Sequence, residues 1–192
     1  VSTKLSVVRY GNVFGSRGSV YNVFSNFVNK EYFPITDKKM TRFNITLDEA
    51  TTMVLKVLKT SVGGEIFVPK LKSYKVIDLA RAMNQKNKLK IIGVRPGEKI
   101  HEQMISSSDS YNTVEFGKFY VILPQGNEKL VKKFLSKNKG EKVKENFEYT
   151  SGKNGKFLNL NELKKLIKNH EKKKIIKKKL KKLKKKEKKK KK

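Results

Sequence analysis

The sequence predicts an α/β fold, because short apolar segments alternate with amphipathic segments along most of the 192 residues. A glycine-rich loop, GNVFGSRG, connects the first apolar segment to the first amphipathic one, an order typical of a strand–loop–helix unit. A third observation is the tetrapeptide TLDE, which matches a capping box at the start of a helix. Together these observations predict an α/β domain built from such units.

The first predicted unit occupies the amino-terminal residues. The segment Lys4–Tyr10, KLSVVRY, is short, apolar and β-branched, so it predicts a buried strand of a parallel sheet. After the glycine-rich loop, Ser19 is the predicted N-cap of a helix. The apolar positions of this helix recur at helical spacing: Val20, Val23, Phe24, Phe27 and Val28.

Two further predicted strands, EYFPIT and MTRFNIT, precede the capping box. Thr46 is the predicted N-cap and Glu49 the N3 residue of a helix that continues to about Lys59. We expect Gly63 and Gly64 to stop this helix. Its predicted apolar face consists of Ala50, Met53, Val54, Val57 and Leu58.

The alternation continues in the second half of the chain. EIFVP predicts a strand, SYKVIDLARAMN a helix and LKIIGV a strand. RPGEKIHEQMI is expected to turn into a helix with its first turn near residues 97–98, and FGKFYVILP predicts a later strand. After Pro124 the sequence is mostly polar up to one predicted helix, Asn161–Ile167, and lysines dominate beyond His170.

This change in composition predicts three regions: residues 1–124 as the main α/β unit, 125–170 as an extension with a short helix, and 171–192 as a lysine-rich tail. The tail holds 16 Lys and 2 Glu, a net charge of +14 out of +30 for the chain, so residues 1–170 carry +16. A basic chain favours anionic partners, namely nucleic acid, acidic lipid or phosphorylated small molecules.

Several classes of protein are excluded or not indicated. The chain has no cysteine, which excludes disulfides and thiolate metal sites, and its two histidines are too far apart for a metal-ligand spacing. No apolar run approaches the ~18 residues of a transmembrane helix, and no signal peptide is visible, so a cytoplasmic location is expected. The sequence also lacks a P-loop and a dinucleotide glycine motif behind its first strand, and no Tyr-x-x-x-Lys pair appears at a useful place.

The glycine-rich loop is a candidate anion site. Gly15 and Gly18 would let the backbone approach a phosphate closely, and Arg17 can form a two-pronged contact to phosphate oxygens. Asn12 can donate and accept hydrogen bonds in the same place. The alternative is a tight strand-to-helix turn with a solvated arginine, and residue types alone favour neither.

The segment RPGEK repeats this arrangement, with Arg95 at the tip of a turn and Glu98 able to orient it or to accept a sugar hydroxyl. Taken alone, it is better explained as an exposed turn with an ordinary ion pair. Arg42 lies between apolar neighbours on a predicted strand, which is typical of a surface residue. His101 is expected one turn into a helix, in a structural role.

Five segments, in this order, carry a family resemblance: SVVRYGNVFGSRGSV, MTRFNITLDEA, GGEIFVPK, IIGVRPGEKIHEQMIS and ENFEYTSG. They cover most of residues 4–152 and resemble the carboxyl half of the nucleotide-sugar 4,6-dehydratases, in the extended short-chain dehydrogenase/reductase superfamily. The most similar group is the inverting UDP-N-acetylglucosamine 4,6-dehydratases, with relatives among capsular-polysaccharide biosynthesis proteins. Asn22 departs from the pattern, because relatives usually have proline there.

The resemblance implies a partial Rossmann-like fold with a small carboxyl-terminal substrate domain. It also implies NADP as cofactor, UDP-N-acetylglucosamine as substrate and a homo-oligomer. The implied reaction is oxidation at C4, loss of water across C5–C6 and return of the hydride with inversion at C5, for surface or flagellar glycans. A C4 ketone acidifies the C5 proton, which makes this order of steps chemically reasonable.

The resemblance also implies roles for particular residues. The substrate contacts it implies are Asn12, Gly15, Ser16, Arg17, Arg42, Arg95 and Glu98, the last three holding the UDP moiety. The cofactor contacts it implies are Tyr10, Asn12 and Val13. The family's glycine motif and Tyr-x-x-x-Lys pair would precede residue 1, so we expect this chain to be the substrate-binding half. Alone, the chain is expected to bind no NADP and to lack dehydratase activity. It is also expected to expose a sheet edge and apolar faces, and therefore to be marginally stable or to associate.

The lysine-rich tail lies beyond the resemblance. Its aliphatic residues, Ile175, Ile176, Leu180 and Leu183, fall roughly on one helical face, so the tail could bind an acidic membrane or nucleic acid. No aromatic residue interleaves the lysines, so base stacking is not indicated. The favoured expectation is a disordered polycation. A non-catalytic basic remnant that binds polyanions through this tail is the alternative function.

Overall fold

The computed structural model describes residues 3–190, with the side chains of 182 and 184–190 left out of the description. The strands are β1 (Val7–Val8), β2 (Tyr32–Ile35), β3 (Thr41–Asn44), β4 (Ile66–Pro69), β5 (Lys72–Lys75), β6 (Lys88–Ile91), β7 (Gln103–Ile105), β8 (Thr113–Phe116), β9 (Phe119–Ile122), β10 (Glu141–Lys142) and β11 (Tyr149–Thr150). The helices are α1 (Val20–Ser25), α2 (Leu47–Thr60), α3 (Val76–Met83), α4 (Ser107–Ser110), α5 (Glu128–Asn138) and α6 (Leu160–Lys190).

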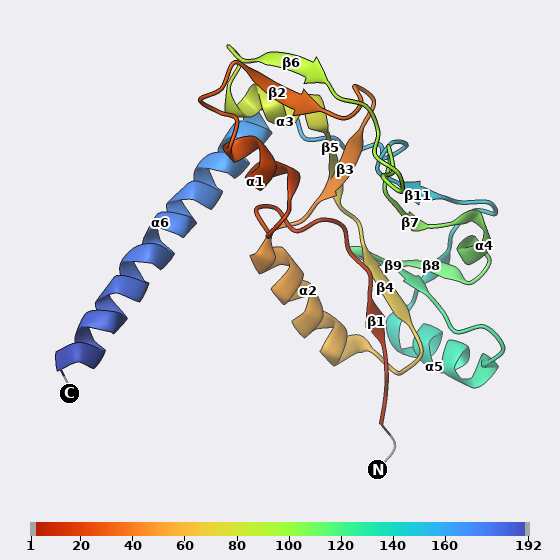
Figure 1. The fold of residues 1–192 in the computed structure, drawn as a ribbon. Helices are drawn as coiled ribbons and strands as arrows, with labels where there is room; N and C mark the ends of the chain where they lie inside the picture. Colours follow the sequence, from red (N-terminus) through yellow and green to blue (C-terminus); the bar gives the residue numbers. More distant parts are fainter. Residues whose placement is uncertain (1–2, 191–192) are drawn as a thin grey trace.

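The main sheet has five strands in the order β1-β4-β9-β8-β10. Its β1–β4 pair is parallel and its other pairs are antiparallel. Three two-stranded sheets surround it: β2 with β6 in parallel, and β3 with β5 and β7 with β11 in antiparallel (Figure 1). This mixed arrangement of helices and strands confirms the predicted α/β class.

Three hydrophobic clusters hold these layers together. The first joins α1, α3 and the start of α6 to β2, with Phe24, Phe33 and Leu79 almost fully buried. The second lies between α2, the main sheet and α5, around Phe67 and Phe134. The third packs β3 against β4, β7, β9 and β11. The segments before and after residue 124 share these clusters, and the predicted division of the chain into three regions stays a prediction.

The predicted helix starts are confirmed. Thr46 and Glu49 form a reciprocal capping box at α2, and the Ser19 side chain accepts from the Asn22 N–H at α1. Such caps satisfy backbone N–H groups that the first turn of a helix leaves without partners. The Asn22 side chain also donates to the carbonyl oxygens of Gly15 (3.1 Å) and Ser16 (2.7 Å), so it ties the glycine-rich loop to α1.

The first strand is shorter and more exposed than predicted. Only Val7–Val8 is strand, and the side chains of Leu5 and Val7 are 76% and 54% exposed. The sequence pattern correctly indicated a parallel partner, β4, but β1 lies at the edge of the sheet and pairs on one side only. The prediction of a buried strand over residues 4–10 was therefore wrong.

The predicted apolar face of α2 is only half buried. Ala50, Met53 and Val57 lie in the core, whereas Val54 is 38% and Leu58 71% exposed. The apolar side chains of α2 occupy a wider arc of the helix than the other described residues cover, so some of them stay exposed. It ends at Thr60, with Ser61 in an extended conformation, before the two glycines that were expected to stop it.

The helix predicted near residues 97–98 is absent from the structure, which shows a turn followed by β7. Gly97 has φ +77°, a left-handed conformation incompatible with an α-helix. The following residues pair instead with other segments: the Ile100 carbonyl accepts from the Thr41 N–H, and β7 pairs with β11. His101 is therefore on a bend and not on a helix.

The carboxyl-terminal part is more helical than predicted. α5 was missed, although Leu130, Val131, Phe134 and Leu135 have helical spacing, because lysines surround them. α6 starts close to the predicted position but extends through the tail to Lys190 instead of ending at Ile167. The expectation of a disordered tail was wrong, because the helix begun by the docked residues continues through the lysines.

Candidate functional site

The glycine-rich loop follows the carboxyl end of β1 and runs beside β3. A Cβ atom at Gly11 would lie 2.6 Å from the Cβ atom of Phe43, so only glycine allows this approach. Val13 pairs with Ile45, and the Phe14 N–H donates to the Ile45 carbonyl at 2.8 Å. Ligands of open α/β sheets bind beyond the carboxyl ends of parallel strands, which is where this loop lies.

Gly15 packs directly on a histidine of α6. A Cβ atom at Gly15 would lie 2.0 Å from Cε1 of His170, and φ at Gly15 is +73°. The His170 ring makes edge contacts with Phe14 and Tyr21, at centroid distances of 5.5 and 5.0 Å. Burial lowers the pKa of His170, and the nearby Lys174 and Lys173 lower it further, whereas Glu171 raises it. Sequence reasoning missed this residue, because nothing local marks it as a loop support.

The side chains expected to contact a ligand from this loop point to solvent. Tyr10, Asn12, Ser16 and Arg17 are exposed, and Val13 is half buried. The Ser16 N–H donates to the Val13 carbonyl and the Ser19 N–H to the Ser16 carbonyl, so the turn uses these donors itself. The loop therefore offers an arginine and an amide to a ligand, with few free backbone donors.

Arg42 is buried, contrary to the expectation of a surface residue. Its side chain is 8% exposed, and Nη1 donates to the carbonyls of Thr41 (2.7 Å) and Ile100 (3.1 Å). Nε lies 3.4 Å from Glu102 Oε1 and Nη2 lies 3.9 Å from Glu98 Oε1. A buried guanidinium requires such partners, and two glutamates from a distant segment provide them.

Two hydrogen bonds between Arg95 and Glu98 close the turn that these residues form. The Glu98 N–H donates to the Arg95 carbonyl (3.0 Å), and the Arg95 N–H donates to Glu98 Oε2 (3.3 Å). Glu98 therefore orients the backbone of Arg95, while its second oxygen faces Arg42. The Arg95 side chain stays exposed. Glu98 thus lies between the Arg42 guanidinium and the Arg95 backbone, and the role of these three residues in binding UDP stays a prediction.

Three further residues belong to this cluster and were not found from the sequence. Tyr74 pairs with Arg42 across β3 and β5, and burial raises its pKa to about 12, with Arg42 lowering and Glu102 raising it. Asn44 is two residues from Arg42 on the same face of β3, and within the described residues its buried Oδ1 has no hydrogen-bond partner. Only Glu102 had a local signal, because it follows Glu98 in the same charged segment.

A hydroxyl network fixes the Ile100–Glu102 segment against β3. Thr41 Oγ1 lies 2.8 Å from His101 Nδ1 and 2.7 Å from Ser151 Oγ. The Glu102 N–H donates to Ser151 Oγ at 2.8 Å. This network holds Glu102, one of the two glutamate partners of Arg42, against β3, and the contacts of His101 are compatible with the structural role that we expected.

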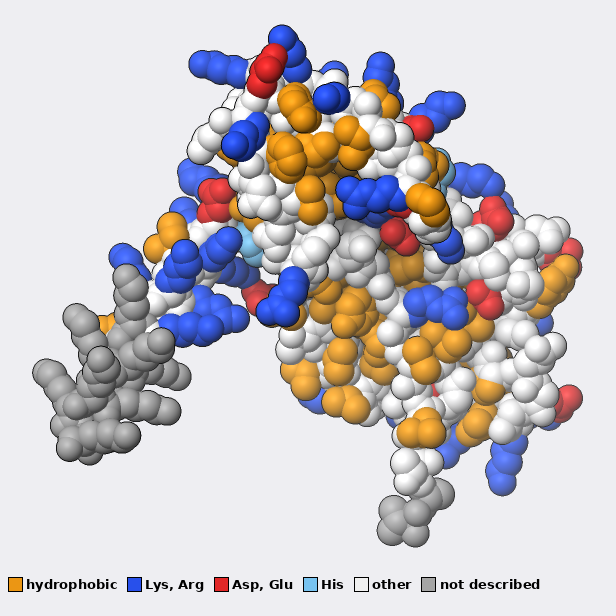
Figure 2. All heavy atoms as spheres, viewed as in Figure 1, with side chains coloured by type: hydrophobic (Ala, Val, Ile, Leu, Met, Phe, Trp, Pro, Cys, Tyr) orange, Lys and Arg blue, Asp and Glu red, His pale blue; other side chains and the backbone are white. Residues whose placement is uncertain are grey.

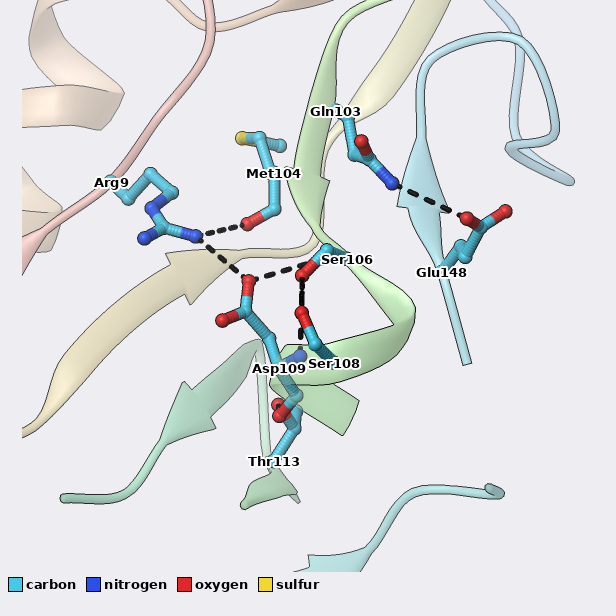
Figure 3. A network of polar contacts seen from close by, with 8 residues as sticks. All are labelled: Arg9, Gln103, Met104, Ser106, Ser108, Asp109, Thr113 and Glu148. Atoms are coloured by element: carbon cyan, nitrogen blue, oxygen red, sulfur yellow. Dashed lines mark hydrogen bonds and ion pairs between the residues drawn. The ribbon is translucent and has the colours of Figure 1, made fainter. Parts of the chain in front are cut away.

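A second polar network anchors the end of β1 (Figure 3). Arg9 donates to the Met104 carbonyl (2.9 Å) and to Asp109 (3.3 Å), which belongs to the capping box of α4 with Ser106. Burial raises the pKa of Asp109, but the hydrogen bonds from Ser106 and the charge of Arg9 outweigh it, so the pKa is lowered. The loop that starts at Tyr10 is therefore held at both ends, by Arg9 and by Asn22.

Two hollows beside α5 include Asn112 and Val131, and neither is lined by a residue expected at the site.

Within residues 3–190, no group of three or more His, Asp or Glu side chains could hold a metal ion. The helices in this part of the chain also include none long and apolar enough to cross a membrane.

Comparison with known proteins finds curated relatives of this chain. The chain is 42% identical over 181 residues, and 45% over 177, to two Campylobacter jejuni proteins named UDP-N-acetylglucosamine 4,6-dehydratase (inverting). Each match covers 88% of this chain and 52% of the relative. A Rickettsia akari protein named UDP-glucose 4-epimerase is 37% identical over 170 residues, covering 86% of this chain and 49% of its own length. The chain thus spans about half the length of the curated relatives it matches.

A solved structure shows the same fold. The X-ray structure of Pen from Bacillus thuringiensis matches 88% of this chain and 51% of its own, with a TM-score of 0.72 and 29% sequence identity. This match supports the predicted partial Rossmann-like fold. Residues 1–124 match the family described as polysaccharide biosynthesis protein. The chain therefore belongs to the polysaccharide biosynthesis protein family.

Proposed function

We propose that this chain forms the substrate-binding part of a nucleotide-sugar 4,6-dehydratase that acts on UDP-N-acetylglucosamine. The observation that carries the proposal is the cluster of Arg42, Glu98 and Arg95, which joins two distant segments of the chain. The identity to two proteins named UDP-N-acetylglucosamine 4,6-dehydratase supports the choice of substrate and reaction. The product would be a 4-keto-6-deoxy sugar nucleotide for surface glycans.

Arg95 is the proposed diphosphate ligand. Its guanidinium is exposed, whereas Glu98 fixes its backbone through the hydrogen bond to the Arg95 N–H. Arg42 is already surrounded by two carboxylates and two carbonyls, so we assign it a positioning role for Glu98. A diphosphate needs a cation with freedom to form a bidentate contact, and the exposed Arg95 side chain forms no ion pair with the side chains that the structure describes.

The glycine-rich loop would contact the sugar and the nicotinamide end of the cofactor. Asn12 and Arg17 are exposed beyond β1, where α/β sheets bind ligands, and Tyr10 and Val13 precede or follow them in the same loop. These residues fit the edge of a bound NADP, which would supply the hydride acceptor. We assign Gly15 and Ser16 to the turn that presents Arg17, because their backbone conformation shapes it.

The remaining machinery would come from outside these residues. The sequence has one Tyr-x-x-x-Lys spacing, Tyr149–Lys153, but the Tyr149 hydroxyl donates to the Leu71 carbonyl (3.0 Å) and Lys153 pairs with Glu148. We therefore infer that the 192 residues alone neither bind NADP nor catalyse dehydration. The exposed edge of β1 would receive the parallel strands of the complementary part. The complete protein is proposed to be a cytoplasmic homo-oligomer, with the division at residue 124 separating the main unit from the extension.

The test uses the product of the complete reading frame that contains these residues. Titration calorimetry with UDP-N-acetylglucosamine should show binding, and Arg95→Ala should raise the Kd at least about tenfold, because a charge-assisted contact contributes about 1.5–3 kcal/mol. Arg81→Ala is the matched control, since Arg81 is an exposed arginine on α3. We expect its Kd to equal that of the wild type.

Product analysis separates the reaction classes. Formation of a 4-keto-6-deoxy sugar nucleotide supports the dehydratase, whereas recovery of a 4-epimer would indicate the activity for which the Rickettsia akari relative is named. An unchanged Kd in Arg95→Ala would remove Arg95 from the site. Absence of any binding or turnover of UDP-sugars by the complete protein would overturn the proposal.

A further inference from the structure

α6 consists of a docked part and a projecting part. Near its start, Leu163 and Ile167 are buried in the first hydrophobic cluster, beside α3. Among the described side chains, the last polar contacts with the body are a hydrogen bond from the Tyr21 hydroxyl to Glu171 (3.3 Å) and an ion pair between Lys173 and Asp48. Beyond these contacts the helix extends away from the body (Figure 1).

The projecting part has its own apolar stripe. Ile175, Ile176, Leu180 and Leu183 are 54%, 56%, 52% and 57% exposed. At 3.6 residues per turn they span an arc of about 140°, whose centre is about 150° away from that of Leu163, Leu166 and Ile167. The stripe therefore does not continue the docked face, and packing against this domain does not explain it.

Lysines surround this stripe. Residues 172–183 contain eight lysines, four aliphatic residues and no acidic residue. Figure 2 shows lysine side chains along the described portion of the projecting helix. A helix with aliphatic residues on one side and lysines on the other matches a partner surface that has negative charge outside and an apolar layer beneath that charge.

We propose that residues 174–183 of α6 bind the surface of a membrane that contains anionic phospholipids. The four aliphatic side chains would enter the boundary between headgroups and acyl chains, and the lysines would contact lipid phosphates. Lys179 falls within the apolar arc, and its long aliphatic stem allows its ammonium group to reach the headgroups. The stripe is short, so binding requires the anionic lipid as well as the aliphatic residues.

A membrane explains the exposed residues better than nucleic acid does. Phosphates of nucleic acid would be satisfied by lysines alone and would leave the aliphatic residues in water. The tail has no aromatic residue to stack on bases. Each aliphatic residue instead gains when it leaves water for the lipid boundary. This inference is independent of the proposed catalytic activity, because α6 beyond Lys173 contains no residue of the candidate site.

The experiment is co-sedimentation of the full 192-residue chain with vesicles of phosphatidylserine and phosphatidylcholine. We expect binding to these vesicles and none to pure phosphatidylcholine. The variant Ile176→Ser/Leu180→Ser/Leu183→Ser keeps every charge and should bind at least about tenfold more weakly. The matched control Leu55→Ser/Leu58→Ser alters exposed leucines of α2 and should bind like the wild type. Circular dichroism confirms that both variants are folded.

Three results would overturn the proposal. The first is the absence of binding to phosphatidylserine vesicles. The second is equal binding by the wild type and the apolar-stripe variant, which would reduce the interaction to charge. The third is tighter binding to a double-stranded oligonucleotide than to vesicles, unaffected by the serine substitutions, which would make nucleic acid the partner. If the wild type still binds vesicles in high salt and the apolar-stripe variant does not, this result would support the role of the stripe, because salt weakens only the contribution of charge.

Discussion

Gly15 has two separate reasons to be glycine. Its φ of +73° is costly for any residue with a Cβ atom, and such an atom would overlap the His170 ring. We expect Gly15→Ala to lower the free energy of unfolding by about 3 kcal/mol, adding the cost of left-handed backbone to that of overpacking. Urea unfolding of the chain, followed by circular dichroism, measures this loss.

Gly18 provides the control for this prediction. Its φ is +76°, but nothing lies within 4 Å of a Cβ atom placed there. Gly18→Ala should therefore cost only the backbone part, about 1 kcal/mol. Equal losses in the two variants would show that His170 moves aside freely, and the loop would then not be supported by α6.

The partly buried position of His170 predicts a pH dependence of stability. Burial lowers its pKa in the folded chain, so the unfolded chain, with a value near 6.5, binds the proton more readily. Stability contributed by neutral His170 is therefore present above about pH 6.5 and is lost as the pH falls from there through the folded-state pKa. Thermal unfolding between about pH 5 and pH 8 measures the effect.

His170→Phe is the matched variant, because phenylalanine keeps an aromatic ring between Phe14 and Tyr21 but cannot titrate. We expect the midpoint of the variant to fall less than that of the wild type below pH 6.5. Identical pH profiles would mean that groups other than His170 dominate the acid response.

At the scale of single elements, local signals predicted helix starts well. Ser19 and the Thr46–Glu49 box mark α1 and α2 because an N-cap acts within one turn and needs no distant partner. β2, β3, β4, α3, β6 and β9 also lie where apolar patterns predicted them. These patterns depend on the spacing of neighbours, which the sequence contains in full.

Elements and site residues that depend on distant partners were not predictable. β7 forms because β11 pairs with it, and Arg42 is buried because Glu98 and Glu102 approach from another part of the chain. The family resemblance named Arg42, Arg95 and Glu98 together, whereas residue patterns alone favoured a surface arginine and an exposed turn. Tyr74 and His170 carry no local signal, since only the tertiary structure brings them to the site.

At the scale of the whole molecule, the exposed leucines of α2 and the edge of β1 form one apolar surface (Figure 2). The Gly64 N–H donates to the Leu5 carbonyl, which ties the segment after α2 to β1. A surface of this kind on an unpaired sheet edge favours association. We therefore expect the purified 192-residue chain to self-associate with increasing concentration.

The variant Leu55→Gln/Leu58→Gln tests the association, because it removes two leucines that are 57% and 71% exposed without changing charge or the core. Burying two such side chains contributes about 2–3 kcal/mol, so the association constant should fall at least about tenfold in sedimentation velocity. Leu180→Gln/Leu183→Gln, on the projecting part of α6, should associate like the wild type. A wild-type chain that stays monomeric over the whole concentration series would contradict the prediction. It would also weaken the proposal that this surface receives the complementary part of a longer enzyme. An apolar surface that is buried in that complex should also become buried by association of the isolated chain.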